Sequence, residues 1–312
     1  MNAGGAGRRG VLVMSHGTPR AVEDIAAFYT EIRRGRPPSP DQLAELEARY
    51  RAIGGTSPLN HITAAQVAGI ARALEEAAPG CYRVVGGAKF AAPRIEEAAA
   101  ELVAAGVDSV VGLVLAPHSS TVSTGEYARR AKQAVAGAAA PAAVVTFTMV
   151  DHWYDEPGFV ALMAERVRAA VESAGDATVV FTAHSVPRRV VDDGDTYPEQ
   201  LERSARAVAG AAGVRDWSVA WQSAGRTDEA WVGPDVNDVI RAVAGAGGAG
   251  VVVCPIGFVS DHLEVLYDID VEARHSATRG GLAFARTASP NDDARLCAVL
   301  GDVIRRVAET PR

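Results

Sequence analysis

Two stretches of the chain, VVFTAHSVP (residues 179–187) and CPIGFVSDHLEVLYDIDVE (residues 254–272), decide the fold and point to the site. The first is an apolar run that stops at His184, and the second is an apolar run that continues into an amphipathic segment. Apolar runs of this length, bounded by turn residues, predict buried strands. Both stretches therefore predict parallel strands that end in polar side chains, where open α/β sheets bind their ligands.

The second stretch carries three carboxylates, Glu264, Asp268 and Glu272, at successive spacings of four residues. Because an α-helix takes 3.6 residues per turn, the spacing predicts that they lie almost in line on one helix face. A series of this kind is also typical of a solvated helix face. If it faces the imidazole of His184, however, it suits a protein that strips water from a divalent cation and accepts protons.

The pattern along the whole chain predicts an α/β fold. Short β-branched runs alternate with longer Ala-rich amphipathic segments, as in parallel sheets with crossover helices. Predicted strands cover residues 11–15, 82–89, 109–117, 143–150, 177–185, 217–223 and 250–258. Since the pattern restarts near residue 145 and 312 residues exceed a usual single core, we expect two similar Rossmann-like lobes, residues 1–143 and 144–312, with the site in a cleft between them.

Composition excludes several classes of function. A net charge of −7 without any stripe of Lys and Arg argues against a nucleic-acid partner. No apolar stretch reaches the roughly 18 to 20 residues that span a bilayer, and no apolar signal core follows the N-terminus. No GxGxxG or Walker-type loop occurs, so we expect no nucleotide. The sequence therefore predicts a cytoplasmic protein without stable membrane association.

Long sequence motifs across nearly the whole chain resemble those of the ferrochelatase family. They include GVLVMSHGTP (10–19), RYRAIGGTSPLN (49–60), LVLAPHSSTVS (113–123), WQSAGRTDEAWVGPDV (221–236) and FVSDHLEVLYDID (258–270). The likeness is greatest to the enzymes of Gram-positive bacteria that act on coproporphyrin III. It implies a chelatase-like fold and a lyase that inserts Fe²⁺ into coproporphyrin III, giving coproheme III in haem biosynthesis. It also implies a monomer, with transient contact to other haem-pathway enzymes.

The resemblance assigns the central residues. Inserting a metal into a porphyrin requires a base for two pyrrole protons and oxygen ligands that hold the cation moderately. His184 and Glu264 match the family's paired active-site His and Glu, and both are expected to handle the metal. Asp268 and Glu272 match an acidic path that leads away from the site, either for metal entry or for proton exit.

Further residues are expected to bind the macrocycle. His16 stands where many Gram-positive relatives have Tyr, and it is either an axial ligand of the iron or a residue that packs on the ring. In IRRGRP, the guanidinium groups of Arg33, Arg34 and Arg36 suit the substrate's propionates. Hydroxyl groups in matching loops are expected to bind the same carboxylates: Thr56, Ser57, Ser120, Thr121 and Ser223. We expect His262 to be structural, on the other side of the helix from Glu264.

Cysteine usage predicts that the protein needs no cofactor, with Fe²⁺ as its substrate. The three cysteines, Cys81, Cys254 and Cys297, are scattered and lack zinc or iron–sulfur spacing. Many actinobacterial relatives hold a [2Fe–2S] cluster with an internal cysteine and a cysteine-rich C-terminal tail. Here Thr124 stands at the internal position and the chain stops at Arg312 without such a tail. We therefore expect no cluster.

Three alternatives remain open from the sequence. The substrate could be protoporphyrin IX, or the reaction could place another metal in a related tetrapyrrole. In a different class, the protein could be a non-catalytic haem or porphyrin carrier that clamps the metal between His16 and His184. The carboxylate series favours catalysis, because a carrier has no need of a path that dehydrates the cation.

Overall fold

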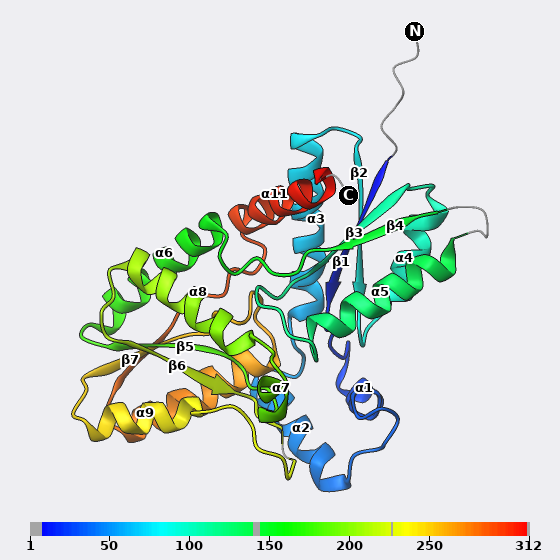
Figure 1. Ribbon diagram of the computed structural model, residues 1–312. Helices are drawn as coiled ribbons and strands as arrows, with labels where there is room; N and C mark the ends of the chain where they lie inside the picture. Colours follow the sequence, from blue (N-terminus) through cyan, green and yellow to red (C-terminus); the bar gives the residue numbers. More distant parts are fainter. Residues whose placement is uncertain (1–7, 140–143, 226, 311–312) are drawn as a thin grey trace.

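The computed structural model describes residues 8–139, 144–225 and 227–310 and shows two parallel sheets (Figure 1). The strand order is β2-β1-β3-β4 in the first sheet and β6-β5-β7-β8 in the second. The strands are β1 (Arg9–Ser15), β2 (Tyr82–Ala88), β3 (Ser109–Val114), β4 (Thr146–Met149), β5 (Thr178–His184), β6 (Trp217–Gln222), β7 (Gly250–Cys254) and β8 (Ala283–Arg286). Because the two orders are equivalent, the prediction of two similar Rossmann-like lobes is confirmed.

Helices connect the strands of each lobe. The first half of the chain contains η1 (Val22–Asp24), α1 (Ile25–Ile32), α2 (Pro40–Ala52), α3 (Leu59–Ala77), α4 (Ile95–Ala104) and α5 (Thr124–Ala138). The second half contains α6 (Pro157–Ala174), α7 (Arg188–Asp192), α8 (Tyr197–Ala212), α9 (Val236–Gly245), η2 (Val265–Ala273), α10 (Arg274–Arg279) and α11 (Ala294–Glu309). None of these described helices has the length and apolar composition needed to cross a membrane.

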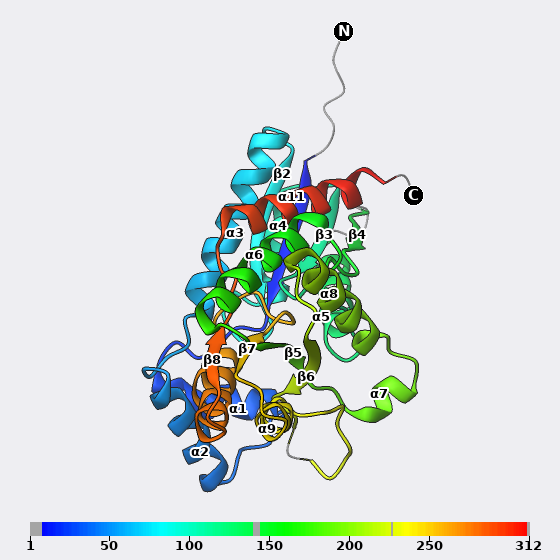
Figure 2. The ribbon, with the colours of Figure 1, turned by 90° about the vertical axis from the view of Figure 1, so that its left-hand side faces the viewer.

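Both faces of each sheet are covered by helices. In the first lobe, α4 and α5 pack on one face and α3 and α11 on the other. In β1 the side chains alternate between two cores: Val11 and Val13 face α3, whereas Leu12 and Met14 face α4. In the second lobe, α6 and α8 cover one face, and α9, η2 and α10 cover the other (Figure 2). This double coverage explains why the strands are continuous apolar runs.

Two segments that the sequence assigned to the second lobe, β4 and α11, belong to the first. The predicted boundary at residues 140–143 lies outside the described residues, but β4, which follows it, pairs with β3 in the first sheet. A parallel strand reached through the crossover helix α5 returns to the sheet it left. The last helix, α11, also crosses back and packs on α3 and β3 (Figure 1). The first lobe is thus completed by residues that the sequence analysis placed in the second lobe. The sequence pattern also missed one strand, β8.

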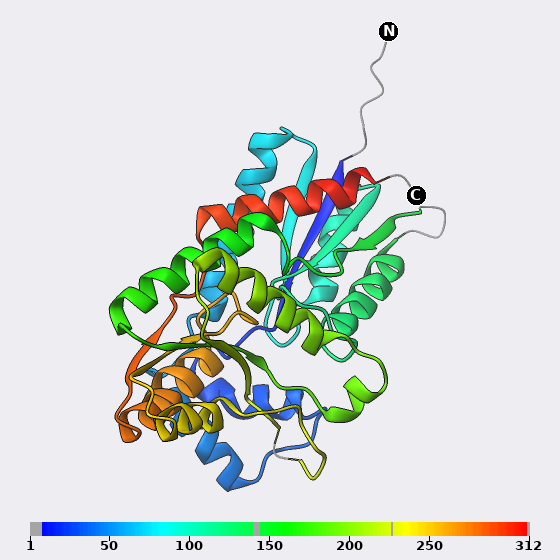
Figure 3. The same cartoon turned by 60° about the vertical axis from the view of Figure 1, so that its left-hand side comes forward.

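The carboxyl ends of the strands place the candidate residues. β1 and β5 are equivalent strands, and His16 follows one while His184 ends the other. The chain turns to opposite sides of the sheet at these central strands, which makes their carboxyl ends the expected ligand site. α2 of the first lobe reaches across to contact η2 of the second (Figure 3). The two lobes therefore meet beside these strand ends.

Candidate active site

Three histidines, two at strand ends and one just before η2, share one pattern of hydrogen bonding. The Nδ1 atom of His184 lies 2.6 Å from the carbonyl of Ser185, that of His16 lies 3.0 Å from the carbonyl of Gly17, and that of His262 lies 2.9 Å from the Ser260 carbonyl. A carbonyl only accepts, so each Nδ1 carries the proton and donates it. In a neutral ring, Nε2 is then left with the free lone pair, ready to accept a proton or bind a metal.

The carboxylate of Glu264 lies between two of these rings. Its Oε1 is 3.6 Å from Nε2 of His184, and its Oε2 is 3.5 Å from Nε2 of His262. Burial raises the pKa of the Glu264 carboxyl, but the two histidines oppose this effect and hold the net pKa well below its usual range. With side chains 39% and 33% exposed, His184 and Glu264 form an ionised acid and a base that solvent can reach.

His262 is a correction to the sequence analysis, which placed it away from Glu264. The helix begins only at Leu263, so His262 precedes it and is not bound by the helical period. Its ring instead packs 4.7 Å from the ring of Phe258 and turns toward Glu264. Burial lowers the pKa of His262, but hydrogen bonding to Glu264 and the charge of that carboxylate outweigh burial and raise it.

His16 faces this group from the first lobe. Its ring contacts two aromatic rings, that of Phe90 at 4.8 Å and that of Phe28 at 6.0 Å between centroids. Solvent reaches the His16 side chain, yet desolvation by the surrounding protein lowers its pKa, against a smaller opposing effect from Glu264. The lowered pKa favours the neutral imidazole, which is the state that can bind a metal.

Asp268 and Glu272 lie on a π-helix, η2, and Glu264 is its N-cap, whereas the sequence predicted an α-helix. Hydrogen bonds in η2 span five residues, a rare geometry that is found frequently at functional sites. Asp268 is buried and accepts from Arg49 of α2 at 2.7 Å and from the Ser223 hydroxyl. Burial raises the pKa of Asp268 to about 6, although Arg49 opposes the shift. Glu272 is 45% exposed and lies 3.9 Å from the same guanidinium, so the series runs from the histidines out to solvent.

The arginines of the loop after α1 are available to a substrate. Arg34 is exposed and Arg33 half-buried, stacked 5.5 Å over the ring of Tyr29. Nε of Arg33 donates to the carbonyl of Arg36 at 3.3 Å. Among the residues that the structure describes, no carboxylate forms an ion pair with Arg33, Arg34 or Arg36. Three cationic groups in this short segment thus remain free to bind anionic propionates.

The hydroxyl groups do not all fit their predicted role. Ser120 and Thr121 donate to one buried carboxylate, that of Asp195, at 2.9 and 2.7 Å. We expected both to bind substrate, but they tie the loop after β3 to the second lobe. Ser223 is likewise engaged by Asp268. Ser57 is buried, and its Oγ accepts from the backbone at 3.3 Å.

Thr56 remains exposed beside Ser57 and is still available as a predicted substrate donor. Arg49 is a residue that sequence reasoning missed. It pairs with Asp268, 219 residues further along the chain. No local sequence pattern marks such a pair.

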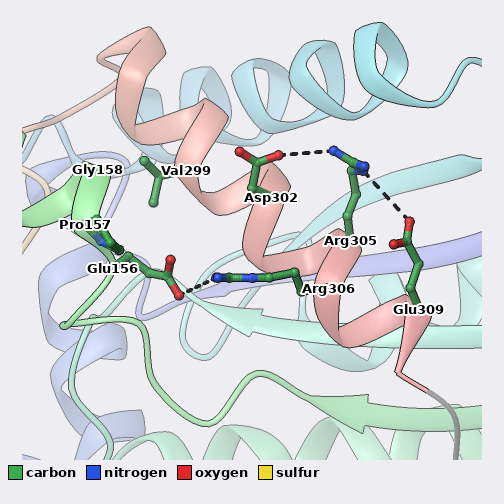
Figure 4. Close-up of a pocket in the computed structure, with 8 residues that line it drawn as sticks. All are labelled: Glu156, Pro157, Gly158, Val299, Asp302, Arg305, Arg306 and Glu309. Atoms are coloured by element: carbon green, nitrogen blue, oxygen red, sulfur yellow. Dashed lines mark hydrogen bonds and ion pairs between the residues drawn. The ribbon is translucent and has the colours of Figure 1, made fainter.

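A surface hollow of about 430 Å³ lies elsewhere, between the first turn of α6 and α11 (Figure 4). Its charged side chains are paired with one another: Arg306 with Glu156, and Arg305 with Asp302 at 3.2 Å. It shares no residue with the strand-end site. The geometry of the candidate site, rather than this hollow, therefore carries the chemistry.

Solved structures share this two-lobed fold. The structure is similar to CbiX, the terminal enzyme for siroheme biosynthesis in denitrifying bacteria, with a TM-score of 0.55 and 16% identity over 97% of this chain and all of that one. It is also similar to SirB from Bacillus subtilis with Fe³⁺, with a TM-score of 0.58 and 12% identity over 97% and 96% of the two chains. At these identities the likeness establishes a two-lobed chelatase fold.

Sequence comparison identifies the family within that class. The ferrochelatase family model matches residues 8–308, so the chain belongs to the ferrochelatase family. Coproporphyrin III ferrochelatase of Geobacillus kaustophilus is 42% identical over 96% of both chains. That of Bacillus subtilis is 40% identical over 95% of this chain and 97% of its own length. A ferrochelatase of Herpetosiphon aurantiacus is 38% identical over 94% of this chain and 97% of its own.

Proposed function

We propose that the protein is a lyase that inserts Fe²⁺ into coproporphyrin III to give coproheme III in haem biosynthesis. The single observation that carries the chemistry is the pair of His184, which ends β5, and Glu264, which caps the start of η2, with Nε2 and Oε1 3.6 Å apart. Membership of the ferrochelatase family supports the reaction. The names of the relatives from Geobacillus and Bacillus support coproporphyrin III as the porphyrin.

The proposed mechanism follows from the lone pairs and charges. Two pyrrole N–H protons leave as Fe²⁺ binds, and Nε2 of His184 accepts them one at a time, releasing the first to solvent before it takes the second. The ionised Glu264 beside it stabilises the imidazolium that forms and offers oxygen to the cation. Asp268 and Glu272 continue the acidic path outward and exchange metal or protons with solvent. His16 faces them from the opposite lobe.

His16 supports axial ligation of the product iron. Its Nδ1 donates to Gly17, so Nε2 retains the lone pair that a haem iron binds. The contacts with Phe28 and Phe90 hold the ring from the side. Packing on the macrocycle is the second role that these aromatic contacts suit, and the absorption spectrum of the product complex separates the two.

Four propionates distinguish coproporphyrin from protoporphyrin, which has two. Moving a carboxylate into a partly dehydrated site costs free energy unless a hydrogen-bond donor pairs with it. Arg33, Arg34 and Arg36 form no ion pair with a carboxylate among the described residues, and they offer more donors than two propionates require. This excess supports the four-carboxylate substrate.

Localisation, oligomeric state and cofactor requirement complete the proposal. We propose a cytoplasmic monomer that contacts other haem-pathway enzymes transiently and requires no cofactor or iron–sulfur cluster. Two of its cysteines, Cys254 and Cys297, are buried and Cys81 is exposed, all as free thiols. Acid-labile sulfide in anaerobically purified protein tests the cluster, and stoichiometric sulfide would overturn that part.

Anaerobic initial rates with Fe²⁺ on coproporphyrin III and protoporphyrin IX, measured side by side, test the function. We expect insertion into both porphyrins, with a higher kcat/KM on coproporphyrin III. A preference for protoporphyrin IX would reject the substrate and leave the chelatase reaction standing. Tight porphyrin binding without any insertion would instead identify a carrier.

A further inference from the structure

Arg286, the last residue of β8, binds two carboxylates that lie on either side of Glu264 in the sequence. Its Nε donates to Oδ1 of Asp270 at 2.8 Å, and its Nη1 donates to Oδ1 of Asp261 at 3.1 Å. Asp261 precedes the helix and Asp270 lies within η2, so the two contacts span Glu264 and Asp268. The Arg286 side chain is only 14% exposed. A guanidinium fork bound on both sides and shielded from solvent fixes its partners more strongly than a surface ion pair.

Asp261 is the centre of this arrangement. Its Oδ1 also accepts from Ser289 at 2.7 Å, and its Oδ2 accepts from the amide of Asn291 at 3.0 Å. The backbone N–H of Asp261 donates in turn to Asn291 at 2.8 Å. Every one of these bonds constrains the backbone immediately before His262, and therefore the direction from which His262 approaches Glu264.

The same loop is attached to the first lobe. Gln66 of α3 donates to the carbonyl of Asn291 at 2.8 Å and accepts from the Ser260 hydroxyl at 3.3 Å. The Ser260 carbonyl then accepts from Nδ1 of His262. A chain of hydrogen bonds thus links the first lobe, the loop and the histidine beside Glu264.

A π-helix needs such support. Its turns contain more residues than the 3.6 of an α-helix and are seldom longer than one turn. Here the π geometry runs over nine residues. If the segment rewound into an α-helix, Asp270 would rotate about the helix axis relative to Asp261, and one guanidinium could no longer bind both.

We propose that Arg286 is a positioning residue for metal insertion, which holds η2 in its π geometry and thereby sets the direction of Glu264 and Asp268. The inference rests on the proposed function for its catalytic consequence only. The stabilisation of η2 by Arg286 is a property of the fold, and it is measured independently of catalysis.

The test uses Arg286→Met, which keeps the aliphatic stem and removes both ion pairs. The matched control is Arg166→Met, because Arg166 of α6 forms a similarly buried pair with Asp293, the N-cap of α11, at 2.9 Å and outside the site. We expect kcat for iron insertion to fall at least about tenfold in Arg286→Met and to stay within about twofold in the control. The Kd for coproporphyrin III, from fluorescence quenching, should change less than about twofold in both, since Arg286 is held by Asp261, Asp270 and Ser289 and not by the proposed porphyrin-binding arginines.

Amide hydrogen exchange provides the second readout. Peptides covering residues 263–273 should exchange at least about tenfold faster in Arg286→Met and not in the control. Should Arg286→Met fail to fold, Asp270→Asn keeps the pair with Asp261 and should show the same two effects at smaller size. Arg286→Lys has one nitrogen, cannot reach both carboxylates, and should rescue only part of kcat.

The outcomes separate the two proposals. If exchange and kcat in Arg286→Met and Asp270→Asn match the Arg166→Met control, the positioning role is wrong while the function stands. Loss of porphyrin binding in step with kcat would also overturn it, because it would indicate general loss of structure. Faster exchange at residues 263–273 in a protein that inserts no metal would support the stabilisation of η2 by Arg286 and reject the proposed function.

Discussion

Replacing Glu264 by Gln should uncouple the histidines that flank it, and the effect on stability should depend on pH. The substitution keeps the shape of the side chain and removes its charge. At the 3.5 Å between Oε2 and Nε2 of His262, one pair of unit charges is worth about 1 kcal/mol in water and about 5 kcal/mol at an effective dielectric constant of 20. Because the two side chains are 16% and 33% exposed, we expect about 1–2 kcal/mol, or about one pKa unit on His262.

The sign of the pH dependence follows from the two shifts. The pKa of His262 is raised in the folded protein, so its contribution is complete below the unfolded value near 6.5 and is lost as pH rises through the folded value. The pKa of Glu264 is lowered, so its contribution is present above its ordinary value of 4.5. Both groups are charged near pH 6. Glu264→Gln should therefore destabilise the protein at pH 6 and have little effect at pH 9.

The assay is urea unfolding of both proteins at pH 6 and pH 9, with the His262 ring proton titrated by NMR. Glu165→Gln is the control, because Glu165 pairs with Arg295, which does not titrate in this range. Its effect should be the same at both pH values. Iron insertion should fall at least about tenfold in Glu264→Gln. Equal destabilisation at pH 6 and pH 9, with an unchanged pKa for His262, would refute the charge coupling.

Four further predictions concern the proposed reaction. His184→Ala should lower kcat at least about tenfold, or about 1.4 kcal/mol, while porphyrin still binds by fluorescence; near-normal turnover would remove it from the mechanism. Since burial raises the pKa of Asp268 to about 6, its carboxylate is neutral below that pH, so the KM for Fe²⁺ should rise there, and Asp268→Asn should abolish this pH dependence. Arg33→Ala and Arg34→Ala should weaken binding of coproporphyrin III more than that of protoporphyrin IX, and equal effects would contradict the substrate assignment. His16→Ala should change the absorption bands of bound coproheme if His16 ligates the iron, and unchanged bands would assign it to packing.

Local sequence determined the strands and the ends on which the site is built. The apolar runs at β1, β5 and β7 specify buried strands, because both faces of a parallel sheet are covered. Once those strands are parallel, His16 and His184 must lie at equivalent edges of the two sheets. Spacing alone also brought Glu264 and Asp268 onto one side of a helix. These features depend on short-range periodicity, which a single sequence displays directly.

Tertiary structure decided the pairings that join distant segments. Arg49 meets Asp268 across 219 residues, Asp195 engages the hydroxyls of Ser120 and Thr121, and Arg286 bridges two carboxylates around η2. A charged side chain in the sequence could bind substrate, solvent or another side chain, and only the folded chain shows which partner is nearest. β4 joined the first sheet for the same reason: its neighbour was set by the crossover through α5, not by its own residues. The π geometry of η2 likewise depends on its contacts, because the sequence pattern of that segment fits an α-helix equally well.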